Sequence, residues 1–193
     1  MIQYEQALRQ TLTANLDDHP VRTIDNDRRK RAAVAIVVVD SGTDVGADVG
    51  YAPAWVDMTG VPGDVRGFDG RIEAVAGGAA ILLCRRAERM NRHAGQWALP
   101  GGRVDEGETA AEAALRELHE ELGLLVGPDD VLGRLDDYPT RSGFVITPIV
   151  VWGGSNVELV PDPNEVAHVL HIGLHELCRD DSPRYVSIPE SDR

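Results

Sequence analysis

The chain has few cysteines and lacks the long apolar runs of a membrane-embedded protein. Its two cysteines, Cys84 and Cys178, do not have the spacing of a disulfide framework or a metal site, so we expect two free thiols in a reducing compartment. No apolar run reaches the length of about 18 residues that a membrane span needs. The N-terminus MIQYEQALRQ lacks the apolar region of a signal peptide. These absences predict a cytoplasmic protein with no membrane partner.

Positive charge is also scarce. The formal net charge is −13 at pH 7, with 32 Asp and Glu against 19 Lys and Arg. An acidic surface disfavours nonspecific binding to nucleic acid, which requires a basic footprint. It does not exclude a small phosphorylated substrate, provided that metal ions offset the charge where the substrate binds.

The length of 193 residues predicts one domain over residues 1–193, large enough to bury a substantial core. Apolar residues on one side of the segment 2–16 predict an amphipathic N-terminal helix. The basic run Arg28 to Arg31 follows, and it is either a solvated flank or a phosphate-binding edge. Residues 41–78 lose periodicity and fill with Gly, Asp and Pro. We expect an insertion there, in the form of a hairpin, a flexible lid or a partner surface.

Five apolar stretches predict the strands of a sheet. They are residues 32–39, 79–84, 131–135, 144–152 and 164–172. Pro148 removes a backbone donor from the fourth stretch, which indicates an edge strand or a bulge. A short helix is expected over residues 173–178 and a frayed tail over residues 181–193.

The chain is organised around residues 102–124, GRVDEGETAAEAALRELHEELGL. Thr109 followed by Glu112 forms a capping box, which predicts a helix that begins at Ala110. Gly123 is the expected C-terminal stop, because glycine adopts the left-handed conformation without strain. The predicted buried stripe comprises Leu115, Leu118 and Leu122. Opposite charges alternate at four-residue spacing along one side, in Glu112, Arg116 and Glu120.

Three acids crowd one face of this predicted helix. Glu117, Glu120 and Glu121 have i, i+3, i+4 spacing, so their carboxylates project together. Like charges repel, and a purely structural helix gains nothing from this arrangement. A hard divalent cation with oxygen ligands explains it, Mg²⁺ being the first candidate and Mn²⁺ the second. The preceding turn, Pro100 to Gly102, leaves backbone groups exposed to a metal or a phosphate.

The same stretch resembles the Nudix box, G-x5-E-x7-R-E-U-x-E-E-x-G-U with U aliphatic, at every specified position. These positions are Gly102, Glu108, Arg116, Glu117, Leu118, Glu120, Glu121, Gly123 and Leu124. Seven of them require one residue type, so a chance match is negligible. The alternative is a surface helix rich in Glu and Ala. It does not explain the Pro-Gly-Gly turn or the register of the acids.

The resemblance covers roughly residues 30–180 without the insertion, and it implies an α/β fold, the Nudix α/β/α sandwich with a mixed β-sheet. It implies that water hydrolyses a diphosphate linkage in a nucleoside diphosphate derivative, with Mg²⁺ or Mn²⁺ as cofactor. The metal ligands implied by the resemblance are Glu117, Glu120, Glu121 and the carbonyl of Gly101. Arg116 would orient Glu117, which is either a metal ligand or the general base, and Glu108 would support them without contacting the metal. The catalytic residues are therefore predicted to be Glu117, Arg116 and Glu120.

A second resemblance lies upstream of the box. The pattern L-L-x-x-R-[SA]…H-x-G-x-x-x-[FL]-P-G-G is similar to an additional motif of the coenzyme A diphosphatase branch of the family. It is carried by Leu82, Leu83, Arg86, Ala87, His93, Gly95, Leu99, Pro100, Gly101 and Gly102. Residues 132–148 also resemble that branch. Leu99 replaces the usual Phe and the insertion 41–78 is a second difference, and both bear on the substrate rather than on the reaction.

This branch makes coenzyme A or an acyl derivative the first substrate hypothesis, with phosphopantetheine and adenosine 3′,5′-bisphosphate as products. The residues predicted to bind substrate are Arg28, Arg31, Arg86, His93 and Gly102. His93 is otherwise a surface or packing residue. The second hypothesis is an ADP-ribose or similar nucleotide-sugar diphosphatase, because Pro139 lies fifteen residues after Leu124, as in that branch. The third is a non-catalytic Nudix-like nucleotide-binding module, although such modules tend to lose the acids that this chain keeps.

Acidic and histidine residues near the C-terminus give weaker signals. Glu165 lies where Nudix chains often carry an acid before a strand, so it either serves the site or forms a salt bridge that ties the loop. His168, His171 and His175 cross from a strand to a helix, and we expect packing and surface roles for them rather than a metal site. The N-terminal helix is compatible with a homodimer, by analogy with many relatives.

Overall fold

The structure is a computed structural model that describes residues 2–25, 28–41, 78–87, 95–178 and 180, together with two short strands at 55–57 and 71–73. The helices are α1 (Gln6–Asp18), α2 (Ala110–Leu122) and α3 (Leu174–Leu177), with a 3-10 turn, η1, at Pro128–Asp130. The strands of the main sheet are β1 (Lys30–Asp40), β4 (Ala79–Arg86), β5 (Trp97–Ala98), β6 (Gly101–Arg103), β7 (Val131–Arg134), β8 (Tyr138–Pro139), β9 (Phe144–Gly154) and β10 (Val166–Gly173). The two short strands are β2 (Trp55–Asp57) and β3 (Arg71–Glu73).

The main sheet is mixed, as the sequence predicted. Its strand order is β10-β4-β1-β9-β7, while β5, β6 and β8 pair with β4, β1 and β9 respectively. β1 and β9 run parallel, whereas β1 with β4, β4 with β10 and β7 with β9 run antiparallel. The predicted α/β class is confirmed. The apolar run in β1 lies in the middle of the sheet, where a strand is covered on both faces and needs no polar side.

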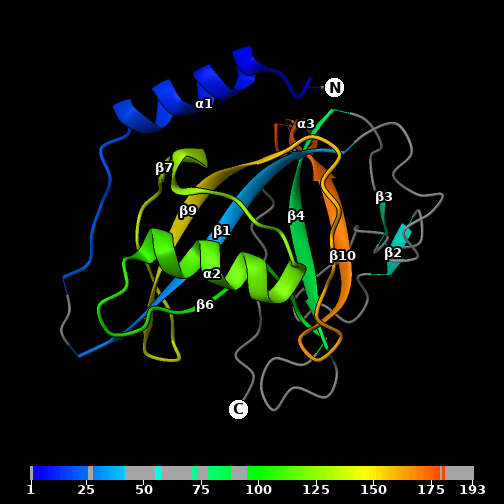
Figure 1. The fold of residues 1–193 in the computed structure, drawn as a ribbon. Coiled ribbons are helices and arrows are strands. Elements are labelled where there is room, and N and C mark those ends of the chain that lie inside the picture. The colour runs from blue at the N-terminus through cyan, green and yellow to red at the C-terminus, as the bar shows by residue number, and fades with distance from the viewer. Residues whose placement is uncertain are drawn as a thin grey trace.

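The helices α1 and α2 cover opposite faces of this sheet (Figure 1). The core beneath α2 takes alternate residues of β1, namely Ala33, Ala35, Val37 and Val39. The core beneath α1 takes the intervening residues Ile36 and Val38, together with Leu8, Leu12 and Leu16 of the helix itself. This alternation follows from the two-residue period of a strand. The result is a sheet with a helix on each face.

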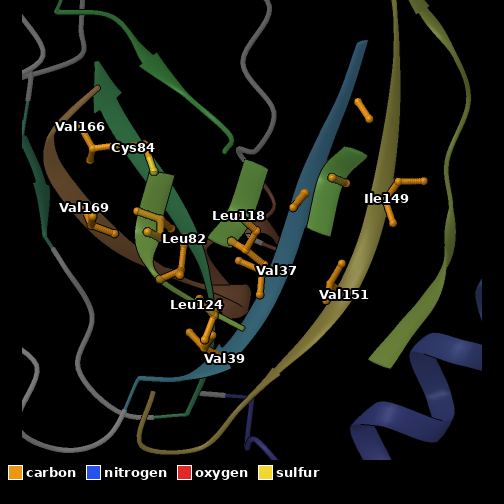
Figure 2. Close-up of a cluster of buried hydrophobic side chains, with 14 of the residues drawn as sticks. Val37, Val39, Leu82, Cys84, Leu118, Leu124, Ile149, Val151, Val166 and Val169 are labelled. Atoms are coloured by element: carbon orange, nitrogen blue, oxygen red, sulfur yellow. The ribbon is translucent and has the colours of Figure 1, made fainter. Parts of the chain in front are cut away.

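The core beneath α2 fixes the helix that carries the acids. Figure 2 shows Leu118 of α2 beside Leu82 of β4 and Val37 of β1. Leu118 and Leu122 have no exposed surface, and Leu115 packs against the same cluster, so the predicted stripe is confirmed. Burial of each leucine contributes about 1.5–3 kcal/mol.

The boundaries of α2 are those predicted from the sequence. Thr109 Oγ1 accepts a hydrogen bond from Glu112 N at 3.2 Å, and Glu112 Oε2 accepts one from Thr109 N at 2.8 Å, so the capping box is complete. Gly123 ends the helix with φ 67°, in the left-handed region. These local bonds define where α2 begins and where it ends.

The N-terminal helix spans Gln6–Asp18 rather than 2–16, so its predicted start was wrong. The first residues are extended against the sheet instead. The Ile2 carbonyl accepts a backbone hydrogen bond of 2.8 Å from the first residue of β4, and the Tyr4 ring stacks on Trp152 with centroids 4.0 Å apart. Contacts with the sheet stabilise these residues more than an additional helical turn would, because the contacts bury apolar surface and also satisfy a backbone hydrogen-bonding group.

Pro148 lies in an interior strand, so the predicted edge position was wrong. β9 pairs with β1 on one side and with β7 and β8 on the other. Pro148 falls between β7, which ends at Arg134, and β8, which begins at Tyr138, and its carbonyl accepts a hydrogen bond from Leu135 N at 3.0 Å. The N and O of a strand residue face the same neighbour. The missing N–H therefore points at the interruption between two short strands, where the ladder does not need a donor.

The insertion 41–78 contains the two short strands. β2 and β3 pair antiparallel, which agrees with the hairpin form of the insertion. Most of that insertion and the tail 181–193 lie outside the described residues.

Cys84 is buried and Cys178 is exposed, and both are free, as predicted. Within the described part of the chain, no helix is long and apolar enough to cross a membrane.

Candidate functional site

Arg116 is the centre of an ion network on α2. Its Nε and Nη2 donate to the carboxylate of Glu108 at 2.9 and 3.1 Å. Its Nη1 donates to Glu117 Oε1 at 2.8 Å and to Glu120 Oε2 at 2.9 Å. Nη2 also donates to the carbonyl of Arg103 in β6 at 2.9 Å. One guanidinium thus holds three carboxylates and anchors α2 to the turn that precedes it.

The predicted line of alternating charges on α2 is only partly formed. Arg116 pairs with Glu120 as expected. The Glu112 carboxylate serves the helix cap instead, with Oε2 at 2.8 Å from both the N and the Oγ1 of Thr109. The Thr109 N–H lowers the pKa of Glu112, and the hydrogen bonds from Arg116 lower the pKa of Glu108. Both outer acids are therefore ionised structural groups at neutral pH.

Glu121 is the most deeply buried acid of the site, with 4% of its surface exposed. Gly101 N donates to its Oε2 at 3.1 Å, and Arg86 Nη1 lies 3.8 Å from its Oε1. Burial raises the pKa of Glu121 to about 7, with Glu117 and Glu165 acting in the same direction and the Gly101 N–H and Arg86 opposing them. A carboxylate in this position is half protonated near neutral pH unless a further cation stabilises its charge.

Glu117 lies against the glycine turn. A Cβ at position 102 would collide with the Glu117 carboxylate, so glycine is needed for the acid to lie over β6. A Cβ at position 101 would collide with the carbonyl oxygen of Ala33 in β1. Burial raises the pKa of Glu117, against the lowering effect of Arg116. The glycine pair therefore lets one short strand approach both β1 and α2.

Oxygen ligands for a divalent cation are present, although the described side chains are not arranged around one. Within the ranges that the structure describes, no three His, Cys, Asp or Glu side chains form a cluster that could hold a metal ion. The Glu120 side chain is 59% exposed and turned toward Arg116. Glu165 raises the pKa of both Glu117 and Glu121, so a cation among these acids would relieve their repulsion. By donor chemistry the acids fit Mg²⁺ or Mn²⁺.

The residues predicted to bind substrate lie in different environments. Arg86 joins the acid cluster, and its Nε is a buried donor that has no partner among the described residues. Arg31 is engaged by Asp137, whose Oδ2 is 3.4 Å from its Nη1, and by a backbone carbonyl of the segment before β1. Arg28 is exposed in the turn before β1. His93 lies outside the described residues.

Two contacts of the site were not predicted. Arg86 stands beside Glu121, and the Arg103 carbonyl accepts a hydrogen bond from Arg116. Neither contact has a local signal in the sequence, because each joins elements that the fold brings together. Glu165 was left open between a site role and a salt bridge, and its role stays a prediction.

Comparison with known proteins gives relatives for about half of the chain. "Uncharacterized Nudix hydrolase NudL" of Yersinia enterocolitica serotype O:8 / biotype 1B is 39% identical over 100 residues, which cover 51% of this chain and 51% of the relative. The protein of the same name from Yersinia pestis strain Pestoides F is 39% identical over 97 residues, with coverages of 50% and 49%. The chain thus spans about half the length of the curated relatives it matches.

A solved structure and a family match extend this comparison. A MutT/nudix family protein from Enterococcus faecalis superposes with a TM-score of 0.50 at 14% identity, over 87% of this chain and 51% of that chain. At this identity the likeness concerns the fold alone. The sequence matches the NUDIX domain family over residues 70–188, which is more than half of the chain. The chain therefore belongs to the Nudix hydrolase family.

Proposed function

We propose that the chain is a metal-dependent diphosphatase that hydrolyses a nucleoside diphosphate derivative, with coenzyme A or an acyl-coenzyme A as its substrate. The observation that supports this most strongly is the pair of sheltered acids Glu117 and Glu121. They are held beside the Gly101–Gly102 turn, with Arg116 bonded to the first of them. Sheltered carboxylates in mutual repulsion are costly, and a site for a divalent cation is the arrangement that requires them.

The reaction is a hydrolysis at phosphorus. A diphosphate resists attack because its anionic oxygens repel a nucleophile. When held by Glu117, Glu120, Glu121 and the Gly101 carbonyl, a Mg²⁺ or Mn²⁺ ion supplies positive charge to those oxygens and lowers the pKa of water. The water oxygen forms a bond to one phosphorus and the bond from that phosphorus to the bridging oxygen breaks. The proton lost by the water passes to a carboxylate of the site.

The charged residues of the site have separate roles in this reaction. Arg116 orients Glu117 through its Nη1, and Glu108 in turn fixes Arg116 through two hydrogen bonds. Glu121 is oriented from the other side by the Gly101 N–H. Glu117 is either a metal ligand or the general base that accepts the proton of the attacking water. Positioning of these groups before substrate arrives lowers the entropic part of the barrier.

The coenzyme A assignment is supported by the motif upstream of the box and by the basic run Arg28–Arg31, which extends into the first two residues of β1. The buried Nε of Arg86 is a donor suited to a phosphate oxygen. Because Arg28 is exposed in the turn before β1, we assign the 3′-phosphate of coenzyme A to the basic run that begins there, Arg28–Arg31. Arg28→Ala should raise KM for coenzyme A about fivefold and leave KM for dephospho-coenzyme A unchanged. Equal changes in KM for both substrates would contradict this assignment.

A product assay tests the proposed function. Coenzyme A, ADP-ribose, NADH and a dinucleoside polyphosphate are offered side by side with Mg²⁺ and with Mn²⁺, and products are identified by mass spectrometry. Release of phosphopantetheine, with the other substrates slow, is the expected result. Preferred cleavage of ADP-ribose would keep the hydrolysis but overturn the coenzyme A assignment. Cleavage of none of them, by a chain that binds the nucleotides, would favour a non-catalytic binding module.

A further inference from the structure

The loop between β9 and β10 is bonded to the acidic end of α2. Val160 N donates to the carbonyl of Leu122 at 2.8 Å, and Asp162 N donates to the carbonyl of Glu121 at 3.0 Å. Carbonyls in the last turn of a helix have no partner within the helix, so the loop supplies the partners they need. The backbone of the most buried acid is thus tied directly to Asp162.

Asp162 also organises the residues that follow it. Its carbonyl accepts hydrogen bonds from Glu165 N at 3.0 Å and from Val166 N at 2.8 Å. Its Oδ1 accepts from Asn164 N at 2.9 Å and from Asn164 Nδ2 at 2.8 Å. This turn explains why β10 begins at Val166, two residues later than the sequence predicted. The Glu165 carbonyl is held in turn by Ala87 N at 2.8 Å, so both sides of that residue are fixed.

We propose that Asp162 is a positioning residue that holds Glu165, and with it the Glu165 carboxylate, beside Glu121. Asp162 reaches α2 through its N–H and Glu165 through its carbonyl, and its carboxylate closes the turn between them. This inference rests on the proposed metal-dependent site and adds a fixed position for the acid outside the Nudix box. If the turn opens, the Glu165 side chain no longer has a fixed position, because a loop residue without such bonds samples many conformations.

Both anchors of Glu165 lead to neighbours of Glu121. Asp162 N donates to the Glu121 carbonyl at 3.0 Å, and Ala87, which holds the Glu165 carbonyl, follows Arg86, whose Nη1 lies 3.8 Å from Glu121 Oε1. Removal of the Glu165 charge should therefore weaken binding of a divalent cation. Loss of Asp162 should do the same, although only through Glu165.

A double-mutant cycle on Mn²⁺ binding tests the proposal without substrate. Free Mn²⁺ is measured by electron paramagnetic resonance in titrations of the full chain. Glu165→Gln should weaken Mn²⁺ binding about tenfold, because a nearby negative charge is lost. Asp162→Ala should weaken it about threefold, and Asp162→Ala combined with Glu165→Gln should bind no more weakly than Glu165→Gln alone. Asp162→Asn keeps the Oδ1 acceptor and should bind within about twofold of the wild type.

Control variants separate positioning from charge and from folding. Glu158→Ala removes an exposed acid from the same loop and should leave Mn²⁺ binding unchanged. Amide exchange should show faster exchange at Glu165 in Asp162→Ala, with α2 still protected. If Asp162→Ala does not fold, Asp162→Ser enters the same cycle, since its hydroxyl closes such a turn more weakly.

The outcomes distinguish this inference from the proposed function. If Asp162→Ala binds Mn²⁺ as the wild type does, or if its effect multiplies with that of Glu165→Gln, Asp162 does not act through Glu165 and the inference is overturned. Asp162→Asn as weak as Asp162→Ala would show a charge effect and overturn it as well. A wild-type chain that binds no Mn²⁺ contradicts the proposed function itself, and the inference falls with it.

Discussion

The two long helices cover opposite faces of one sheet but are specified in different ways (Figure 1). Each has 13 residues. α2 has a complete capping box, a left-handed glycine at its end and five buried residues, whereas α1 has no side-chain cap and no buried residue. The helix that carries the acids is therefore fixed by its own sequence and by the core. The other helix is fixed mainly where it docks.

Docking contacts of α1 come from distant parts of the chain. Arg9 pairs with Asp130 at 3.1 Å, and His19, just after the helix, lies 2.8 Å from Asp136. A Cβ at Gly133 would crowd the side chain of Leu16, so the glycine allows the helix to approach β7. Exposed ion pairs contribute little to stability, about 0–1 kcal/mol each. α1 should therefore tolerate substitutions that α2 does not.

The largest expected difference between the helices is in catalysis. Glu120→Gln and Glu121→Gln in α2 should each lower kcat about a thousandfold with the fold retained, because each removes a proposed metal ligand. Asp18→Asn in α1 is the matched control and should leave kcat unchanged. Initial rates at saturating substrate and Mg²⁺, with circular dichroism as the check on folding, measure the difference. Activity that survives both changes in α2 would refute the metal-site assignment.

The next difference is in the free energy of unfolding. Leu118→Ala in α2 should cost about 3 kcal/mol, because the leucine has no exposed surface and its loss leaves a cavity. Leu12→Ala in α1 should cost about 1 kcal/mol, because that side chain is only partly buried. Urea unfolding followed by far-ultraviolet circular dichroism measures both. Equal losses would show that α1 is held by its core as firmly as α2.

The smallest expected effect is a loss of stability as the pH rises, which depends on Glu121 of α2. Burial raises the pKa of Glu121 to about 7, from an ordinary value of 4.5. Between these values the folded protein holds a proton that the unfolded chain releases, so stability is full below pH 4.5 and falls as the pH rises toward 7. The metal-free wild type should lose about 2 kcal/mol more than Glu121→Gln between pH 5 and pH 8. Urea unfolding in the presence of a chelator, at both pH values, measures this, and parallel curves would contradict it.

The sequence by itself determined the helix that carries the acids. The limits of α2, its buried stripe and the register of Glu117, Glu120 and Glu121 all follow from residues within a few positions of one another. The capping box and the glycine stop act over three or four residues, and helical periodicity repeats over the same distance. The apolar stretches of the sheet were equally local, so the α/β class could be predicted before any pairing was known.

Only the tertiary structure decided which distant groups meet. The start of α1 depends on contacts of Ile2 and Tyr4 with the sheet, and the interior place of Pro148 depends on an interruption between two neighbouring strands. The contact of Arg86 with Glu121 and the turn at Asp162 likewise join separate elements. No short-range pattern encodes such contacts, because strand order and register depend on the burial of the whole sheet rather than on neighbouring residues.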